Sequence, residues 1–416
     1  MSAKKTDELI PVAEARERIL AAIAPVGTEQ VSLAQAAGRT LAADAVARVT
    51  QPPKAVSAMD GYAVRAADVG TVPATLKVIG FAPAGRPFGG TVGAGQAVRI
   101  FTGAPLPDGA DTIVIQEDTD AKGEGANAHV VVKEAAPLGR YVRKAGLDFK
   151  SGDALLRAGR VLSPRDVGLC AAMNVPWLTV RRKPRVAILA TGDEIVQPGE
   201  ALGPGQIVSS NSWALAAFID ANGGEAINIG IAPDEKATLK TMAESARGAD
   251  LLVTTGGASV GDHDLVQSAL GEIGLSLDFW KIAMRPGKPL MFGKLGTTPL
   301  LGLPGNPVSS LVCSLLFLAP MLAKFLGRSE TEPRRIAARL GADLKANDRR
   351  EDYLRATLER AADGTIVATP FKAQDSSMMA TLAKADGLIV RAPLAPALKS
   401  GETVDVITLA PPGVVI

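Results

Sequence analysis

The spacing of hydrophobic and polar residues divides the chain into segments with different repeats. Residues 11–24 carry a helical repeat, and Pro11 suits the first position of the helix that this repeat predicts. Residues 163–173 carry a similar repeat much further along the chain. Between them, residues 77–134 consist of short β-branched runs separated by Gly and Pro, which predicts a small all-β insert. We therefore expect one helical unit that the insert divides into two pieces.

After a polar linker at residues 181–184, buried strands and helices alternate along the chain. The pattern predicts strands at 185–190, 226–231, 250–255 and 299–303, with helices at 212–222, 235–247 and 264–270. Such alternation is typical of a doubly wound α/β domain with a largely parallel sheet. A second polar linker at 327–333 ends this domain, and strand-like runs from residue 334 onward predict a small β-barrel or sandwich.

Length and composition agree with a multidomain α/β plus β protein. A chain of 416 residues is long enough for about three domains of roughly 150 residues, and the split unit raises the expected number to four. The predicted units are a split N-terminal domain (1–46 and 147–180), a β-rich insert (47–146), a central α/β domain (181–327) and a C-terminal β-barrel (333–416). With 47% hydrophobic residues, a disordered chain is excluded.

Charge and targeting patterns exclude several classes of partner. The 45 basic and 43 acidic residues nearly cancel, so we expect neither a nucleic-acid nor a membrane partner. The N-terminus lacks the hydrophobic core of a signal peptide. The apolar stretch at 308–326 contains serines, Pro320 and Lys324, so we expect a buried helix there and a cytoplasmic protein.

Cysteine and histidine are too rare to build a metal or disulfide site. Cys170 and Cys313 lie in apolar helical stretches and are expected in the core. With only His129 and His263 besides, imidazole metal chemistry is improbable as well. Any metal in this protein should therefore be bound through oxygen.

Three of the predicted strands end in glycine-rich turns with polar residues. These turns are Thr-Gly-Asp-Glu at 191–194, Gly-Gly-Ala-Ser-Val-Gly-Asp-His-Asp at 256–264 and Pro-Gly-Asn-Pro at 304–307. Ligands bind at the carboxyl ends of strands in such sheets. Gly256 and Gly257 would let the backbone approach phosphate oxygens, and Asn306 would cap a helix whose N-terminus attracts anions. Each turn alone could be purely structural, but the three together favour a phosphate site.

Acidic residues share these strand ends. Glu194, Asp234 and Asp264 place carboxylates beside the predicted phosphate site, without histidine or thiolate, which favours Mg²⁺. The alternative is that Asp234 and Asp264 cap the helices that follow them.

A basic cluster stands in the segment Trp-Lys-Ile-Ala-Met-Arg-Pro-Gly-Lys-Pro at 280–289. Its two prolines exclude a regular helix, so Lys281, Arg285 and Lys288 project from a stiff loop. Such a local concentration of cations suits an oxyanion or a polyphosphate. A solvated basic loop is the alternative.

Two further motifs, Ser-Ala-Met-Asp-Gly-Tyr-Ala at 57–63 and Phe-Thr-Gly-Ala-Pro at 101–105, have no evident role within the insert that contains them.

Taken in order, these motifs resemble one family closely. SAMDGYA, RIFTGAP, ATGDE, GGASVGDHD, WKIAMRPGKP and GLPGNPVS are similar to those of the bacterial molybdopterin molybdenumtransferases, the MoeA-type family to which the C-terminal domain of gephyrin is related. The resemblance covers essentially the whole chain and implies that the α/β domain is of the molybdopterin-binding type. It implies the last step of molybdenum cofactor synthesis, in which molybdate and adenylylated molybdopterin are the substrates and AMP is released in a Mg²⁺-dependent step.

The resemblance also implies partners and the roles of individual residues. It implies an elongated homodimer with a composite site, in which Asp60 and Thr102 complete the site of the partner, and contacts with molybdopterin adenylyltransferase and molybdoenzyme maturation factors. By match, the catalytic residues are Asp60, Thr102, Asp148, Glu194, Asp264, Lys281 and Arg285; the binding residues are Gly256, Gly257, Ser259, Gly261, Lys288, Pro304, Gly305, Asn306, Arg350 and Ser376; and the metal ligands are Glu194, Asp234 and Asp264.

The sequence departs from the family pattern at three places. Arg285 stands where lysine is common, Leu147 replaces an acid, and Asp375-Ser376-Ser377 replaces Gly-Ser-Gly.

Two rival functions remain at this point. A molybdopterin adenylyltransferase has a similar α/β domain but lacks the insert and the C-terminal β domain, and a non-catalytic scaffold of the gephyrin kind would be expected to carry a long linker or a second enzymatic domain.

Overall fold

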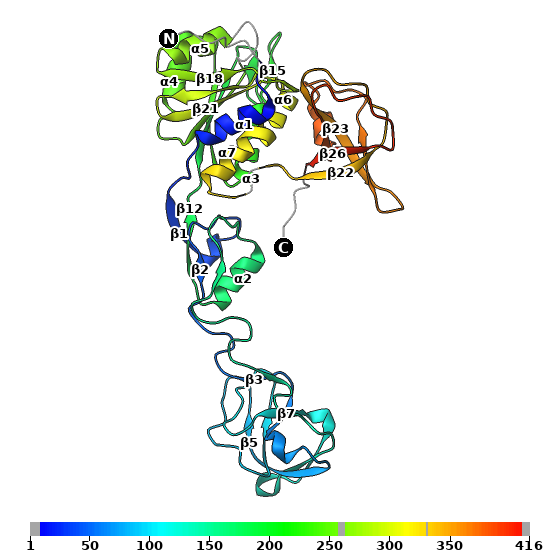
Figure 1. Ribbon diagram of the computed structural model, residues 1–416. Coiled ribbons are helices and arrows are strands. Elements are labelled where there is room, and N and C mark those ends of the chain that lie inside the picture. The colour runs from blue at the N-terminus through cyan, green and yellow to red at the C-terminus, as the bar shows by residue number, and fades with distance from the viewer. Residues whose placement is uncertain (1–8, 257–262, 330–331, 410–416) are drawn as a thin grey trace.

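The chain is elongated, with its units arranged from one end to the other (Figure 1). The computed structural model describes residues 9–256, 263–329 and 332–409. The α/β domain and the C-terminal barrel lie side by side at one end, and the β-rich insert forms the opposite end. The split unit lies between them and is joined to the insert by a narrow connection of two segments of the chain.

A six-stranded sheet forms the centre of the α/β domain, in the order β16-β13-β17-β21-β20-β18. Its strands are β13 (Arg185–Thr191), β16 (Glu225–Ala232), β17 (Leu251–Thr255), β18 (Leu275–Trp280), β20 (Met291–Leu295) and β21 (Thr298–Leu303). The first four strands in the sheet order are parallel, as the sequence predicts, whereas β20 runs antiparallel to both of its neighbours, β21 and the edge strand β18. The carboxyl ends of the parallel strands therefore share one edge of the sheet.

Helices cover both faces of this sheet. The helices are α1 (Val12–Ala21), α3 (Asn211–Ala221), α4 (Lys236–Glu244), α5 (His263–Gly271), α6 (Pro307–Cys313) and α7 (Ala319–Phe325). One buried cluster joins α1, α3, α6 and α7 to the sheet, and another joins α4 and α5 to its other face. Helix α1 thus packs on the α/β core, although the sequence groups it with the split unit. Pro11 is the N-cap of α1 and not its first helical residue.

The apolar stretch near residue 308 is a core helix. Helices α6 and α7 are continuous through a π-helical segment, Ser314–Leu318. The resulting helix, Pro307–Phe325, is long and apolar enough to cross a membrane, but 78% of its most apolar window is buried inside the protein. The predicted buried helix is therefore confirmed. Cys313 at the end of α6 and Cys170 in α2 (Pro164–Ala172) are both fully buried, as expected.

The split unit joins two distant parts of the chain in one core. Strand β1 (Thr28–Ser32) pairs antiparallel with β12 (Trp177–Arg181), and β2 (Ala45–Val46) pairs with β11 (Ala154–Leu156). Helix α2 begins with a capping box formed by Ser163 and Asp166. At the neck of the insert, β3 (Val56–Ser57) pairs with β10 (Val142–Arg143).

The insert is a six-stranded sheet in the order β7-β4-β6-β5-β9-β8. Its strands are β4 (Gly61–Val64), β5 (Ala74–Ala82), β6 (Gln96–Ile100), β7 (Thr112–Ile115), β8 (Thr119–Lys122) and β9 (His129–Val132). Short 3₁₀ turns lie at Leu33–Gln35 in the split unit and at Ala66–Asp68, Gln116–Asp118 and Gly125–Asn127 in the insert. The predicted all-β character of this segment is confirmed.

The C-terminal domain is a closed barrel of five strands. They are β22 (Arg335–Leu340), β23 (Glu351–Arg360), β24 (Ile366–Pro370), β25 (Gly387–Arg391) and β26 (Thr403–Thr408), with α8 (Met379–Ala383) between β24 and β25. The barrel closes because β23 pairs with both β24 and β25. Strand β19 (Met284–Arg285), from the basic loop of the α/β domain, adds to β23 and ties the two domains together.

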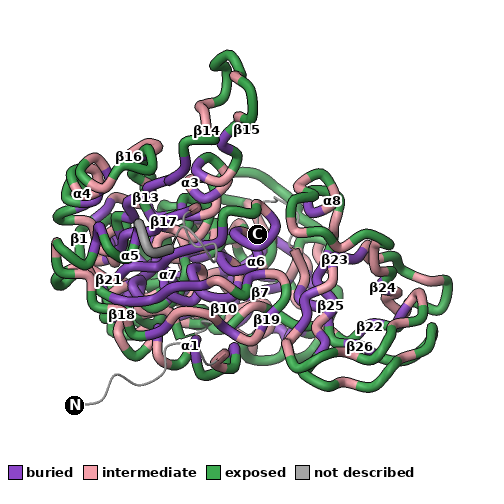
Figure 2. Tube along the Cα trace, turned by 90° about the horizontal axis from the view of Figure 1, so that it is seen from above, coloured by how far each residue is buried: buried purple, intermediate pink, exposed green. Residues whose placement is uncertain are grey.

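Like β18 and β20, a short pair of strands in the α/β domain has no counterpart in the predicted elements. After β13 the chain forms β14 (Ile195–Val196) and β15 (Ile207–Val208), which pair and project from the body of the domain (Figure 2). Ile207 and Val208 are exposed. This projection begins directly after the Thr-Gly-Asp-Glu turn, so it lies beside the carboxyl ends of the parallel strands.

Candidate active site

A cleft of about 560 Å³ opens between the α/β domain and the C-terminal barrel. Its walls come from the turn after β13, the basic loop around β19, the turn after β21 and two segments of the barrel. The lining residues are Glu194, Ile207, Met284, Arg285, Pro286, Gly287, Lys288, Pro289, Pro304, Gly305, Asn306, Ser309, Arg350, Gln374, Asp375 and Ser376. Most of the polar residues predicted for this region are therefore brought together in one cleft.

Three strand ends meet at Gly256, which lies next to Gly305 of this cleft. Gly256 has φ +92°, and a Cβ on it would lie 2.3 Å from the carbonyl oxygen of Thr191. A Cβ on Gly305 would in turn lie 3.5 Å from the Cα of Gly256. Only glycine fits at position 256, because both the left-handed backbone and the close contact exclude a side chain. The remainder of the predicted phosphate turn, including Gly257, Ser259, Gly261 and the side chain of Asp264, lies outside the described residues.

Asn211, which is not among the predicted site residues, connects two of these strand ends. Its Nδ2 donates hydrogen bonds to Thr255 Oγ1 at 2.9 Å and to the carbonyl oxygen of Gly305 at 2.7 Å. Asn211 is the first residue of α3, so the helix start is attached to both turns. An Asn at the start of a helix is ordinarily assigned to capping, which hides this role.

The Pro-Gly-Asn-Pro turn is attached to the barrel and not capped by its own asparagine. Asn306 occupies the N-cap position of α6, but its side chain makes no capping hydrogen bond, so the predicted side-chain cap is wrong. Its Nδ2 instead donates to Ser376 Oγ at 2.8 Å, and the carbonyl oxygen of Ser376 accepts from the N–H of Val308 at 3.1 Å. Ser376 therefore lies at the helix start, despite the altered residues beside it.

Buried polar contacts hold the Ser376 segment in place. The Gln374 side chain accepts from the backbone N–H of Arg355 at 3.0 Å and from its Nε at 3.2 Å, and it donates to the Arg355 carbonyl oxygen at 2.9 Å. Arg355 is almost fully buried, and burial lowers the pKa of its guanidinium. Neither residue was predicted from the sequence.

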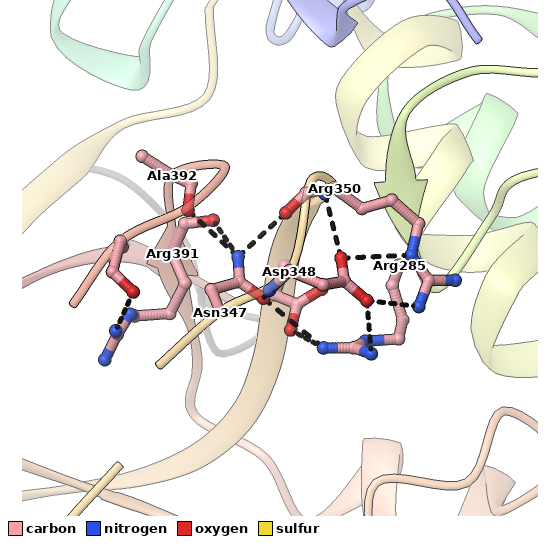
Figure 3. Close-up of polar contacts among 8 residues, drawn as sticks. Arg285, Asn347, Asp348, Arg350, Arg391 and Ala392 are labelled. Carbon is pink, nitrogen blue, oxygen red and sulfur yellow. Dashed lines mark hydrogen bonds and ion pairs between the residues drawn. The ribbon is translucent and has the colours of Figure 1, made fainter. Parts of the chain in front are cut away.

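Two arginines of the cleft share one carboxylate (Figure 3). Arg350 Nη2 lies 2.7 Å from Asp348 Oδ2, and Arg285 Nη1 lies 3.3 Å from the same oxygen. Arg285 also pairs with Asp352. Hydrogen bonds from the side chain and backbone of Arg350 hold the pKa of Asp348 below its usual range, whereas burial raises the pKa of Asp352. Arg285, predicted as catalytic, thus joins the basic loop to the barrel through two acids that the sequence did not reveal.

The other two cations of the basic loop lie differently. Lys288 is exposed and lines the cleft, while its carbonyl oxygen accepts from the N–H of Ile282 at 2.9 Å. Lys281 has φ +83°, and its Nζ lies 3.9 Å from the ring centroid of Trp280. Lys281 is not among the residues that line the cleft described above. Of the three cations in this loop, Arg285 and Lys288 therefore line the cleft and Lys281 does not.

The acidic residues after β13 and β16 lie on neighbouring strands. Glu194 lines the cleft, and the N–H of Asp234 donates to Asp193 Oδ1 at 2.9 Å, which joins the two turns. Asp234 is not a helix cap, because Glu235 holds that position in α4. Among residues 9–256, 263–329 and 332–409, no three carboxylate, imidazole or thiol groups gather in the manner of a metal site.

Comparisons with known proteins identify the family. Three family models match: the MoeA N-terminal region (domain I and II) at residues 10–174, the probable molybdopterin binding domain at 187–324 and the MoeA C-terminal region (domain IV) at 337–409. The molybdopterin molybdenumtransferase of Haemophilus influenzae is 34% identical over 96% of this chain and 98% of its own length. This chain belongs to the molybdopterin molybdenumtransferase family.

Further members of the molybdopterin molybdenumtransferase family agree in sequence and fold. The Nostoc protein of that name is 39% identical over 79% of this chain and 76% of its own length. The crystal structure of a molybdopterin biosynthesis MoeA protein from Pyrococcus horikoshii superimposes with a TM-score of 0.84 at 34% identity, covering 97% of this chain and 100% of that one. The multidomain architecture predicted from the sequence is thereby confirmed.

Asp60, Thr102 and Asp148, also carried over from the molybdopterin molybdenumtransferase pattern, lie in the insert or in its connection and do not line the cleft. Asp60 Oδ1 accepts hydrogen bonds from the backbone N–H and the hydroxyl of Thr102, both at 2.8 Å, in the insert. These bonds lower the pKa of Asp60. The N–H of Asp148 donates to the Gln51 carbonyl oxygen at 3.0 Å, in the connection to the insert. The insert forms the opposite end of the chain from the cleft (Figure 1).

Proposed function

We propose that this protein performs the last step of molybdenum cofactor synthesis. It would insert molybdenum from molybdate into adenylylated molybdopterin, with Mg²⁺-dependent release of AMP. The observation that carries the proposal is the cleft in which Lys288, Arg350 and the Asn306–Ser376 pair face one another. A cationic cleft at the carboxyl ends of parallel strands suits an anionic, phosphate-bearing substrate.

The two walls of the cleft suggest different tasks. On the α/β side, the tight turn at Gly256 and the start of α6 at Asn306 would hold the phosphates of the adenylate. On the other side, Lys288 and Arg350 would attract molybdate. Asp348 and Asp352 hold the Arg285 guanidinium in ion pairs. Arg285 would therefore position Arg350 through their shared partner Asp348, and its own charge would attract molybdate less than the charge of Lys288 does. Water or a molybdate oxygen would then cleave the anhydride, and AMP would leave.

The donor set at the strand ends fits Mg²⁺. Glu194 and Asp234, with Asp264, offer hard carboxylate oxygens, and Mg²⁺ is commonly bound by one or two carboxylates together with substrate phosphates. A preformed cluster of three acids is therefore not required for such a site. When bound, the ion would neutralise charge on the pyrophosphate.

We further propose a homodimer with composite sites. Asp60 and Thr102 face solvent at the end of the chain remote from its own cleft, so they would complete the cleft of a partner subunit. The adenylylated substrate implies a molybdopterin adenylyltransferase upstream, and the product implies a molybdoenzyme maturation factor downstream. We expect these encounters to take place in the cytoplasm.

AMP release tests the proposal directly. Purified protein is incubated with adenylylated molybdopterin, Mg²⁺ and molybdate, and AMP is followed over time. We expect release that depends on molybdate and on Mg²⁺ and that falls strongly in Lys288→Ala, Lys281→Ala and Asp264→Asn variants. Lys183→Ala, which changes an exposed lysine in the linker, is the matched control. Synthesis of the adenylate from ATP would instead indicate an adenylyltransferase, and no turnover would indicate a scaffold.

A further inference from the structure

The insert carries a stack of aromatic and cationic side chains beside Asp60. The Arg99 guanidinium lies 5.1 Å from the ring centroid of Tyr62 and 5.0 Å from that of Phe101. Phe101 in turn meets Phe81 edge to face, with centroids 5.3 Å apart and planes at 68°. Tyr62 is buried and closes one end of this stack, whereas Phe81 is 58% exposed at the other. The stack therefore presents one open aromatic surface.

The sheet explains why these side chains lie together. Arg99 on β6 is opposite Tyr62 on β4 and opposite Phe81 on β5, so all three side chains project from one face. Two hydrogen bonds fix the guanidinium, one to the carbonyl oxygen of Gly61 at 3.0 Å and one to Gln116 Oε1 at 2.6 Å. The surface is thus held by the sheet and is preorganised for binding.

The stack is continuous with the motif residues of the insert. Phe101 directly precedes Thr102, and Gly61, which binds Arg99, directly follows Asp60. Both hydrogen bonds from Thr102 end on Oδ1 of Asp60. Within the described part of the chain, no hydrogen bond to Oδ2 occurs, so this oxygen is available to a ligand that donates an N–H.

We propose that Phe81 and Phe101, with Asp60 at their edge, bind one flat heteroaromatic ring of the adenylylated molybdopterin held in the cleft of the partner subunit. The inference rests on the function and the composite dimer proposed above. Adenine and the pyrimidinone ring of the pterin are both planar, and each bears an amino group that can donate a hydrogen bond to a carboxylate. Aromatic side chains bind such rings by stacking, and a guanidinium behind Phe101 keeps the surface rigid.

The test compares substrate binding with turnover in the full-length protein. The variants are Phe81→Ala and Phe81→Trp, and Trp177→Ala serves as the control because Trp177 is 57% exposed on β12, outside the insert. Calorimetry without molybdate gives the Kd for adenylylated molybdopterin and, separately, for AMP, and light scattering gives the oligomeric state. We expect Phe81→Ala to raise the Kd for the substrate about ten-fold, Phe81→Trp to restore it and Trp177→Ala to leave it unchanged.

The AMP measurement distinguishes the two rings. A parallel rise in the Kd for AMP would place adenine on Phe81, and an unchanged Kd for AMP would place the pterin there. An unchanged substrate Kd in Phe81→Ala would overturn the inference, and so would dissociation of the dimer, because Phe81 would then belong to a protein interface. Wild-type protein that binds the substrate without releasing AMP would refute the proposed function while the Phe81 comparison still decides the ring site.

Discussion

Asn211→Ala should separate the assembly of the cleft from the stability of the fold. The amide makes two hydrogen bonds, to Thr255 Oγ1 at 2.9 Å and to the Gly305 carbonyl oxygen at 2.7 Å, and the alanine variant loses both. A neutral hydrogen bond contributes about 1 kcal/mol. If both bonds align the turns that hold the transition state, their loss of about 2 kcal/mol corresponds to a roughly thirty-fold lower kcat/KM.

The assay is molybdate-dependent AMP release, measured together with urea unfolding. Asn222→Ala is the matched control, because Asn222 ends the same helix and its Nδ2 also donates a hydrogen bond, to the Phe218 carbonyl oxygen at 2.7 Å. We expect the free energy of unfolding to fall by about 2 kcal/mol in Asn211→Ala and by about 1 kcal/mol in Asn222→Ala, and only Asn211→Ala to lose activity. Folded Asn211→Ala with wild-type kcat/KM would show that the two turns do not need this connection.

Three further predictions follow from the described contacts. Gly256→Ala should abolish AMP release, since its Cβ would meet a carbonyl oxygen at 2.3 Å, whereas Gly271→Ala, with open space around it, should remain active. Burial opposes ionisation of Asp250, yet hydrogen bonds from Arg182 keep its pKa below the usual value. Its stabilisation is therefore complete above about pH 4 and lost as pH falls through the folded pKa, so Asp250→Asn should cost about 2 kcal/mol in urea unfolding at pH 7 and progressively less towards pH 2. Burial raises the pKa of both thiols, Cys170 and Cys313, so Ellman's reagent should label neither in the native protein and both in guanidinium chloride; rapid labelling of the native protein would contradict the described core.

The predicted elements that agree best with the structure are those whose burial is continuous along the chain. Strand β13 is apolar at nearly every position and β17 at its first three, because the parallel sheet buries both faces, and this pattern is visible without tertiary information. Strands β18 and β20 lie towards the antiparallel edge, where β18 alternates between half-buried and exposed residues. The sequence does not predict β18 because the same alternation is found in surface loops, and it does not predict β20 either, although the first three residues of β20 are buried.

The site was predictable where its chemistry is local. The Thr-Gly-Asp-Glu turn and the Pro-Gly-Asn-Pro motif carry their signal within a few residues, and Glu194 of the first and Pro304, Gly305 and Asn306 of the second line the cleft. Asn211, Asp348 and Gln374 carry no such signal, because each acts on a residue that the fold alone brings near. Asn211 binds a carbonyl 94 positions away, and Asp348 pairs with an arginine 63 positions away. A single sequence provides no means of pairing such positions.

The separation in space between the insert, which carries Asp60, and the cleft of the same subunit has a genetic consequence. If each site combines the cleft of one subunit with the insert of another, a chain damaged only at Asp60 and a chain damaged only at Lys288 are individually inactive. Co-expressed in equal amounts, they would form mixed dimers in about half of all cases, and each mixed dimer would contain one undamaged site and one doubly damaged site. Roughly a quarter of the wild-type sites would then return, so two null alleles of this gene would complement each other.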